Sequence, residues 1–519
     1  SPQREGRAML ALALSAAVAG VDAHLVRVET DSAAGLPAFG IVGLPDRALN
    51  ESRDRVRAAI ANSGFAFPPG RLLVNLAPAD MRKAGVGFDL PIALALLATD
   101  EQLDGAALRE YVVCGELALD GSLRAVPGVL AMTLAAKRGG VARILVPEAN
   151  RDEAALVEGI DVFAVPTLAE AIAVVLGRGA QFRRRGATVL ARDERPSCGD
   201  YVDVRGQLLA KRALEISAAG GHNLVLVGPP GCGKTMLARR LPSILPAMTI
   251  GEALDVTSVY SIAGLLGARP RVVTTRPFRS PHHTASRVSL VGGGSQPRPG
   301  EISLAQHGVL YLDELAEFPR STLEVLRQPL EEGTVTIARA AGTLTFPARF
   351  MLVASMNPCP CGFRGVRGSD CRCDDAIVQR YLGKLSGPLL DRIDLHVSVS
   401  RVSFGELTEH DGGETSATIR TRVERARALQ TARLARRPYA TNAAIPAADV
   451  RALCPLDADA LALLEGAVTR GTLSARAFDR ITRVARTIAD LAGTERIARP
   501  HVAEALVYRA AVARPSAAA

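Results

Sequence analysis

The most constraining feature of this 519-residue chain is a short segment near its centre. Residues 224–227 form an apolar run with the length of one buried strand, and residues 228–235 follow it directly as GPPGCGKT. This octapeptide matches the pattern G-x-x-x-x-G-K-[ST] in full, and an apolar helical pattern begins after it at Met236. A strand, a glycine-rich loop and a helix in this order predict an α/β domain in which backbone N–H groups and a helix N-terminus bind phosphate.

Each part of the octapeptide has an expected role in binding ATP. Lys234 is expected to reach the β- and γ-phosphates, and Thr235 is expected to offer its hydroxyl to Mg²⁺. The alternative is a glycine-rich turn with a chance lysine, but all eight positions and both flanking elements would then agree by accident. The other motif residues are expected to surround the phosphates: Gly228, Pro229, Pro230, Gly231, Cys232 and Gly233.

A second apolar run ends in two acidic residues. Residues 309–314 read VLYLDE, the pattern of a buried strand that carries carboxylates to a phosphate site. We expect Asp313 to join the Mg²⁺ shell and Glu314 to orient the attacking water, because phosphoryl transfer needs charge neutralisation and an oriented nucleophile. A third apolar run, 350–355, leads to Asn357, which is then suited to orient the water or the γ-phosphate.

Two arginines are predicted to act outside their own ATP site. Arg392 lies in the segment LLDRID at 389–394, where apolar neighbours would anchor it, and this suits an arginine finger that reaches the ATP of a neighbouring subunit. Arg339 lies between two β-prone runs, 335–337 and 344–346, and is expected at the tip of a hairpin. At such a tip it would contact DNA, or it would be a solvated turn residue.

Four of the eight cysteines form two C-x-C pairs on one predicted loop. Four thiolates on one loop can close a tetrahedral zinc site, which predicts structural Zn²⁺. The usual ligand spacing is C-x-x-C, so reduced thiols without metal remain an alternative. The pair His282 and His283 is expected on a loop near nucleotide or DNA rather than at a metal. The clustered cysteines are Cys359, Cys361, Cys371 and Cys373.

The first third of the chain is an α/β region without a nucleotide motif. Its segments 115–121 (GELALDG) and 144–150 (ILVPEAN) resemble the proteolytic domain of Lon proteases, which uses a serine–lysine dyad. By the flanking pattern the serine position falls near Gly87 and the lysine position near Leu130, so the nucleophile and its base are missing. We therefore expect a Lon-like fold without peptidase chemistry.

Further motifs extend over nearly the whole chain, and together they resemble those of the ComM (YifB) family of magnesium-chelatase-like AAA+ ATPases. One departure is KAGVG at 83–87, where the family pattern leads us to expect different small residues. The motifs are GIVGLP at 40–45, ESRDRV at 51–56, NLAPAD at 75–80, FDLPI at 88–92, FRSPHHT at 278–284, LVGGG at 290–294, LSGPLLDRIDL at 385–395 and RVARTIADL at 483–491, besides the octapeptide, the acidic pair and the cysteines.

This resemblance implies a homo-hexameric ring that acts on single-stranded and branched DNA. Such a ring would be an ATP-driven helicase that promotes branch migration during integration of donor DNA in natural transformation. The resemblance also implies that Arg476 is the sensor-two arginine and Arg392 the finger, and that the pore elements are the Arg339 hairpin and the stretch near 262–300. In similar ATPases the segment of Gln207 lies over the adenine, although a simple helix cap is an equal alternative for this residue.

The patterns divide the multidomain α/β chain into four parts. We expect a Lon-protease-like domain without its dyad at 1–180, a linker at 181–200, a P-loop AAA+ core with the cysteine insert 359–373 at 201–397, and a helical lid at 398–519. In the lid, the helix that begins near Arg476 should have one apolar face, and a second face with Arg476, Arg480, Arg483 and Thr487 that is open to solvent, phosphate or DNA.

Charge favours a nucleic-acid partner. The formal net charge is +9, and residues 414–519 hold 17 arginines and no lysine against 10 acidic residues. Such an excess suggests DNA, although a solvated arginine-rich surface is the alternative. Residues 9–20 superficially resemble a signal peptide, but they pass directly into a strand-like stretch, and no apolar run reaches the ~18 residues of a membrane span. We expect a cytoplasmic protein with no membrane partner.

Two other functions stay open. A magnesium-chelatase-type ATPase subunit would need neither the Lon-like domain nor the basic C-terminal region. An ATP-dependent chaperone-like remodeller remains possible, whereas the missing serine–lysine pair removes the protease form of this reading.

Overall fold

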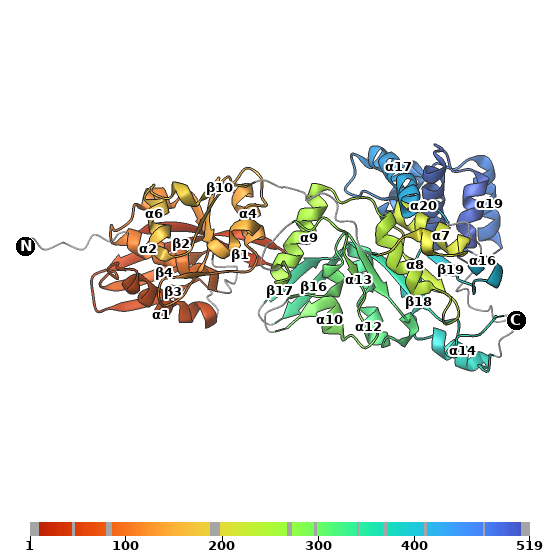
Figure 1. The fold of residues 1–519 in the computed structure, drawn as a ribbon, viewed down its shortest axis with the longest axis horizontal. Helices are drawn as coiled ribbons and strands as arrows, with labels where there is room; N and C mark the ends of the chain where they lie inside the picture. Colours follow the sequence, from red (N-terminus) through yellow and green to blue (C-terminus); the bar gives the residue numbers. More distant parts are fainter. Residues whose placement is uncertain are drawn as a thin grey trace, which may run out of the picture.

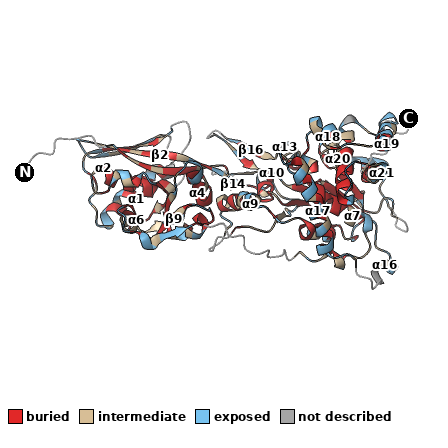
Figure 2. Ribbon diagram, turned by 90° about the horizontal axis from the view of Figure 1, so that it is seen from above, coloured by how far each residue is buried: buried red, intermediate tan, exposed pale blue. Residues whose placement is uncertain are grey.

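The chain folds into an N-terminal lobe at one end of the long axis and a central lobe at the other, and the C-terminal helices lie beside the far part of the central lobe (Figure 1). Burial is concentrated inside each of these parts (Figure 2). The structure is a computed structural model. It describes residues 10–43, 47–78, 86–186, 198–266, 272–294, 298–339, 342–366, 371–408, 413–470 and 473–509.

The N-terminal lobe is built on an eight-stranded sheet in the order β10-β9-β8-β5-β1-β2-β4-β3. β1 pairs antiparallel with β2 and parallel with β5, so the apolar run that resembles a signal peptide is an inner strand. Between its end residues Asp89 and Thr99, helix α2 is apolar on all sides, and every one of its residues is buried. The strands are β1 (Ala11–Ala19), β2 (Asp22–Ala33), β3 (Ala38–Val42), β4 (Arg71–Ala77), β5 (Tyr111–Val113), β6 (Glu116–Leu117), β7 (Leu123–Arg124), β8 (Arg143–Pro147), β9 (Asp161–Val165) and β10 (Arg183–Arg185). The helices are α1 (Arg47–Asn62), α2 (Asp89–Thr99), α3 (Gly105–Leu108), α4 (Val129–Arg138), α5 (Arg151–Ala154) and α6 (Leu168–Val175).

The linker expected at 181–200 was predicted to begin too early in the chain. Residues 183–185 form β10, which pairs antiparallel with β9 and so satisfies backbone groups that would otherwise be left at the edge of the sheet. The N-terminal lobe therefore extends beyond residue 180. The remaining linker residues 187–197 lie outside the described part of the chain.

The two positions of the missing dyad lie in apolar surroundings. A Cβ atom on Gly87 would lie 3.7 Å from Val126 Cγ1 and 4.0 Å from Met132 Cε. Leu130 is fully buried in the first turn of α4. Residues 83–85 of the segment KAGVG lie outside the described residues.

The central lobe contains a parallel five-stranded sheet in the order β12-β15-β18-β11-β19. The three middle strands are fully buried, as their apolar sequences require, since helices cover both faces of such sheets. The carboxyl ends of parallel strands meet at one edge, which brings the loops after β11, β15 and β18 together. The strands are β11 (Leu224–Val227), β12 (Phe278–Arg279), β15 (Val309–Leu312), β18 (Met351–Met356) and β19 (Leu395–Ser398).

Helices and two small hairpins complete this lobe. The hairpin predicted around Arg339 is confirmed, and its strands are longer than expected, with Arg339 paired to Gly342. The hairpin strands are β13 (Gly292–Gly293), β14 (Arg298–Pro299), β16 (Thr334–Arg339) and β17 (Gly342–Pro347). The helices are α7 (Leu208–Gly220), α8 (Lys234–Arg240), α9 (Ile250–Ala263), α10 (Arg287–Val291), α11 (Glu301–Leu304), α12 (Arg320–Glu324), α13 (Arg327–Glu332), α14 (Asp375–Leu382) and α15 (Gly387–Leu390).

The C-terminal helices share one core with α7 and the central sheet. The apolar face predicted for α20 is buried, but its polar face is not uniformly open to solvent. Arg476 is exposed, whereas Thr487 is fully buried and its hydroxyl lies 2.8 Å from Nε2 of His222. The expected open arginine face is therefore wrong at its C-terminal end, because α20 packs against α7 as well as α17 and α21. The helices are α16 (Phe404–Thr408), α17 (Ser416–Leu434), α18 (Ala447–Leu453), α19 (Ala458–Thr469), α20 (Ala475–Ala492) and α21 (Arg499–Val507).

The N-terminal and central lobes are in direct contact. Helix α4 packs on α9, and apolar residues from both lobes form one buried cluster. The turn between β1 and β2 meets β17, where a Cβ atom on Gly20 would lie 2.4 Å from the carbonyl oxygen of Thr345. Among the described residues, no helix has both the length and the apolar character needed to cross a membrane.

Candidate nucleotide site

The glycine-rich loop has the backbone geometry that its sequence predicts. Gly231 and Gly233 have φ angles of 75° and 90°, which residues with a Cβ atom rarely adopt. Helix α8 then begins at Lys234, directly beyond this turn. The loop therefore presents backbone groups and a helix N-terminus to one point, which is the arrangement that binds phosphate.

The side chain of Lys234 folds over this loop. Its Nζ donates hydrogen bonds to the carbonyl oxygens of Gly228 at 2.7 Å and Pro229 at 2.8 Å. It also donates to Oδ1 of Asn357 at 3.2 Å, at the end of the adjacent strand β18. Burial lowers the pKa of Lys234, and the charge of Asp313 opposes this shift. The predicted pair Lys234 and Asn357 is thus brought together at the loop.

Oxygen atoms suited to Mg²⁺ converge beside the lysine. The hydroxyl of Thr235 donates to Oδ2 of Asp313 at 2.9 Å, and the hydroxyl of Ser355 donates to Oδ1 of the same carboxylate. Burial raises the pKa of Asp313, but the hydrogen bonds from Ser355 and Thr235 outweigh it and hold the pKa below its usual value. An ionised carboxylate and a hydroxyl are hard oxygen ligands, so these residues fit Mg²⁺.

Glu314 has a partner that the sequence did not reveal. Nδ1 of His283 lies 3.3 Å from Oε2 of Glu314, and the ring of His282 lies against that of His283 at 4.1 Å. The sequence predicted these histidines on a loop near nucleotide or DNA, and the structure places His283 beside Glu314, the residue expected to orient the attacking water. The specific contact depends on the pairing of β12 with β15, which no local pattern in the sequence specifies.

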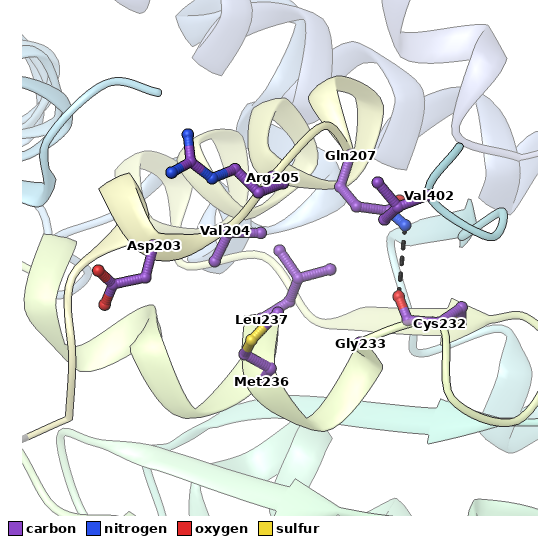
Figure 3. Close-up of a pocket in the computed structure, with 9 residues that line it drawn as sticks. All are labelled: Asp203, Val204, Arg205, Gln207, Cys232, Gly233, Met236, Leu237 and Val402. Atoms are coloured by element: carbon purple, nitrogen blue, oxygen red, sulfur yellow. Dashed lines mark hydrogen bonds between the residues drawn. The ribbon is translucent and has the colours of Figure 1, made fainter. Parts of the chain in front are cut away.

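A small cavity adjoins the phosphate loop, and Gln207, which the resemblance leads us to expect near the adenine, is one of its lining residues (Figure 3). Its volume is about 120 Å³. The side chain of Gln207 does not cap α7 but donates hydrogen bonds to the carbonyl oxygens of Cys232 at 3.3 Å and Ser400 at 2.6 Å. Gln207 holds the N-cap position of α7 with its backbone, while its side chain joins the phosphate loop at Cys232 to the segment after β19 at Ser400. The lining residues are Asp203, Val204, Arg205, Gln207, Cys232, Gly233, Met236, Leu237 and Val402.

Arg392 lies at the opposite edge of the sheet from this site. It precedes β19, whose first residue pairs with the first residue of β11, whereas the phosphate loop follows the last residue of β11. Four residues of strand separate the two edges by about 13 Å. Arg392 forms an ion pair with Glu331 at 2.5 Å. The hydrogen bond from Arg392 lowers the pKa of Glu331. Arg480, one turn after Arg476 in α20, lies 3.9 Å from Asp391, so the start of α20 also lies near this far edge.

The four clustered cysteines converge as predicted. Their Sγ atoms lie within 4.8 Å of one another, with separations of 3.3, 3.7 and 3.5 Å among Cys359, Cys361 and Cys371. Four sulfur atoms at ~2.3 Å from a tetrahedral zinc ion lie about 3.8 Å apart, so this donor set fits Zn²⁺. All four, including Cys373, are free cysteines. In the described parts of the chain no other cluster of three or more ligating side chains is found.

The residue expected to contact DNA, Arg339, is only partly described by the structure. The backbone of Arg339 ends β16, but its side chain is outside the described residues. The second expected pore stretch includes residues 267–271 and 295–297, which are also outside them. The role of Arg339 therefore stays a prediction.

Comparison with known proteins relates every lobe to one family. Residues 200–407 match the family model described as magnesium chelatase, subunit ChlI, residues 28–150 match subunit ChlI of Mg-chelatase, and residues 413–509 match the ChlI C-terminal model. An uncharacterised protein of Mycobacterium tuberculosis is 45% identical over 97% of this chain and 99% of its own. The competence protein ComM of Haemophilus influenzae is 44% identical over 97% and 98%. The uncharacterised protein YifB of Escherichia coli is 44% identical over 96% and 97%.

Proposed function

Because this chain belongs to the ComM/YifB family of magnesium-chelatase-like proteins, we propose that it is an AAA+ ATPase that drives movement along DNA. The observation that carries the proposal is the convergence of Lys234, Thr235, Asp313 and Asn357 at one edge of the sheet. In this proposal the protein is a cytoplasmic helicase that promotes branch migration when donor DNA is integrated during natural transformation. The name of the competence relative supports this biological setting.

The roles of the site residues follow from their positions. Lys234 would bind the β- and γ-phosphates of ATP, while Thr235 and Asp313 would hold Mg²⁺, which neutralises charge on the phosphates. Glu314 would orient the attacking water, and Asn357, already bonded to Lys234, would orient the γ-phosphate. Gln207 would keep the adenine cavity in shape by joining its two walls.

The far-edge arginines support assembly into a ring. Arg392 is separated from its own phosphate loop by the length of the sheet, and the start of α20, which carries Arg476, lies near the same far edge, so neither is suited to its own ATP. In a cyclic homo-hexamer each chain presents one edge to the opposite edge of its neighbour. We propose that Arg392 serves as the finger, and Arg476 as the sensor-two arginine, at the ATP held by the next subunit.

The proposed track is single-stranded and branched DNA. A motor needs phosphate contacts that do not depend on base sequence, and arginine provides such contacts. The formal net charge of +9 and the arginine-rich C-terminal region support this partner. The hairpin β16–β17, which ends at Arg339, is our candidate for the DNA contact. We also assign structural Zn²⁺ to the four-cysteine cluster.

A magnesium-chelatase-type ATPase subunit is the second candidate function. The family models favour it, as does 29% identity over 30% of this chain to the 67 kDa magnesium-chelatase subunit of Chlorobaculum tepidum. The basic C-terminal region favours DNA, since insertion of a metal into a porphyrin does not require it. A chaperone-like remodeller has no separate observation in its favour.

The test is ATP turnover with and without single-stranded DNA, together with migration of a labelled three-way junction. We expect DNA to stimulate turnover and the junction to move at low salt, with both effects falling as salt rises. Arg339→Ala should keep the DNA-free rate and lose stimulation, whereas Arg109→Ala, which removes an exposed arginine of the N-terminal lobe, should change neither. Wild-type protein that turns over ATP but neither binds DNA nor moves a junction would refute the DNA motor and favour the second candidate.

A further inference from the structure

The loop that carries the four cysteines packs directly on the phosphate loop. A Cβ atom on Gly362 would lie 2.6 Å from Cδ of Pro230 and 3.7 Å from Cγ of Asn357. The amide of Gly362 donates to the carbonyl oxygen of Cys359 at 2.9 Å, which closes a tight turn over Pro230. The residue that directly follows the first C-x-C pair therefore packs closely on Pro230, one of the residues that surround the expected phosphates.

The same loop touches the nucleotide site at two further points. Asn357, which accepts a hydrogen bond from Lys234, is only two residues before Cys359. On the other side the guanidinium of Arg401 lies over the ring of Phe363, 5.4 Å from its centroid. Arg401 immediately precedes Val402, which lines the adenine cavity. The cysteine loop is thus linked to the phosphate loop through Pro230, to Lys234 through Asn357, and to the cavity wall through Arg401.

This loop has almost no hydrophobic core of its own. Among its described residues, 359–366 and 371–373, only Cys359 and Gly362 are buried. Loops with few buried apolar groups are the easiest parts of a protein to open. The shape of the loop must therefore come from another source, and the convergence of four Sγ atoms within 4.8 Å supplies one. Metal binding by such a cluster contributes directly to the folding of the segment that carries it.

We propose that the cysteine cluster holds one Zn²⁺ ion whose presence keeps the phosphate loop in its nucleotide-binding shape, so that metal occupancy controls nucleotide affinity. This inference rests on the proposed ATPase function, because it concerns the same nucleotide site. The coupling is reciprocal by thermodynamic necessity, so nucleotide should tighten zinc binding by the same factor by which zinc tightens nucleotide binding. A change at the metal is passed on through the contact of Gly362 with Pro230 and through Asn357.

The experiment measures zinc content and the Kd for a fluorescent ATP analogue on the full chain. Protein as purified should hold about one zinc per chain, and a zinc-selective chelator in excess Mg²⁺ should raise the Kd about tenfold, the cost of re-ordering about one loop residue. Added Zn²⁺ should restore the original Kd. The double variant Cys361→Ser/Cys373→Ser should behave as the chelated protein, whereas Cys198→Ser, outside the cluster, should not.

A second pair of variants tests the contact without removing any thiol. Gly362→Ala adds a methyl group against Pro230 and should weaken nucleotide binding about tenfold while zinc stays bound. Gly365→Ala is the matched control, because Gly365 has a similar positive φ of 75° against 83° but no atom within 4 Å of the added Cβ. Its Kd should stay near the wild-type value.

The possible failures are distinct. Protein that binds no zinc even after incubation with the metal would overturn the metal site. Zinc release without a change in Kd, or equal effects of Gly362→Ala and Gly365→Ala, would overturn the coupling and leave the ATPase intact. Zinc-loaded wild-type protein that binds no nucleotide would instead refute the proposed function.

Discussion

Replacing Arg392 by alanine should stop ATP turnover while ATP binding remains. Arg392 lies at the sheet edge opposite its own phosphate loop, so its expected target is the ATP of the neighbouring subunit. To reach that target the Arg392 side chain, which is 15% exposed, must leave the 65% exposed Glu331 and the carbonyl oxygen of Pro388, to which Nη1 donates at 2.6 Å. The ion pair with the exposed Glu331 carboxylate contributes about 0–1 kcal/mol, so it adds little to the cost of moving the arginine.

The expected loss is much larger than the ion pair. An arginine finger contributes about 10³–10⁵-fold in kcat, which corresponds to about 4–7 kcal/mol of barrier height. Arg392→Ala should therefore lower kcat by about this factor with little change in the Kd for ATP. Glu331→Gln is the matched control, because it removes the ion pair and keeps the arginine. Its kcat should stay within about twofold of the wild-type value.

Mixed assemblies decide whether Arg392 acts between subunits. In rings formed from equal amounts of Arg392→Ala and Lys234→Ala chains, about one interface in four combines an intact Lys234 with an intact Arg392. ATP turnover should then recover to about a quarter of the wild-type rate, while each variant alone stays inactive. Mixtures of Lys234→Ala chains with the double variant Lys234→Ala/Arg392→Ala contain no complete site and should stay inactive.

If rings shown by mass to contain both Arg392→Ala and Lys234→Ala chains recover no ATP turnover, Arg392 does not act on the ATP of a neighbouring subunit. Arg392 would then serve its own chain or no ATP at all. Normal ATP turnover by Arg392→Ala alone would show that Arg392 takes no part in hydrolysis.

Three further predictions follow from single contacts. Glu314→Gln should bind ATP normally but not hydrolyse it, and substantial hydrolysis in a single-turnover assay would show that another group orients the water. His283→Ala should lower kcat about tenfold at constant Kd because Glu314 loses its partner, and His283→Asn, which keeps a donor, should restore part of the rate; a change in Kd alone would contradict this role. Burial lowers the pKa of His396 to about 4. As the pH falls from 6.5 to 4, this histidine is protonated in the unfolded chain but stays neutral in the folded chain. The free energy of unfolding should therefore fall by about 3 kcal/mol across this range. Denaturant titrations of the wild type and of His396→Gln should differ in slope against pH over this window, and parallel curves would exclude His396 as the cause.

Local patterns in the sequence were sufficient for the elements of the nucleotide site. The octapeptide, the buried run ending at Asp313 and the strand leading to Asn357 each depend on residues close together in the chain. Their meeting also follows from sequence, because parallel strands place their carboxyl ends at one edge. The hairpin β16–β17 and the apolar face of α20 were predictable for the same reason, since both follow from a periodic pattern.

Contacts between distant segments required the folded chain. The partnership of His283 with Glu314 depends on the order of strands in the sheet, and the burial of Thr487 depends on the packing of α20 against α7. The contact of Gly362 with Pro230 joins residues 132 positions apart, and a C-x-C pattern carries no information about it. Periodicity and motif spacing describe which groups a segment exposes, because they arise from backbone geometry within that segment. Which groups then meet is set by the packing of whole elements against one another, and that packing places the cysteine loop on the phosphate loop.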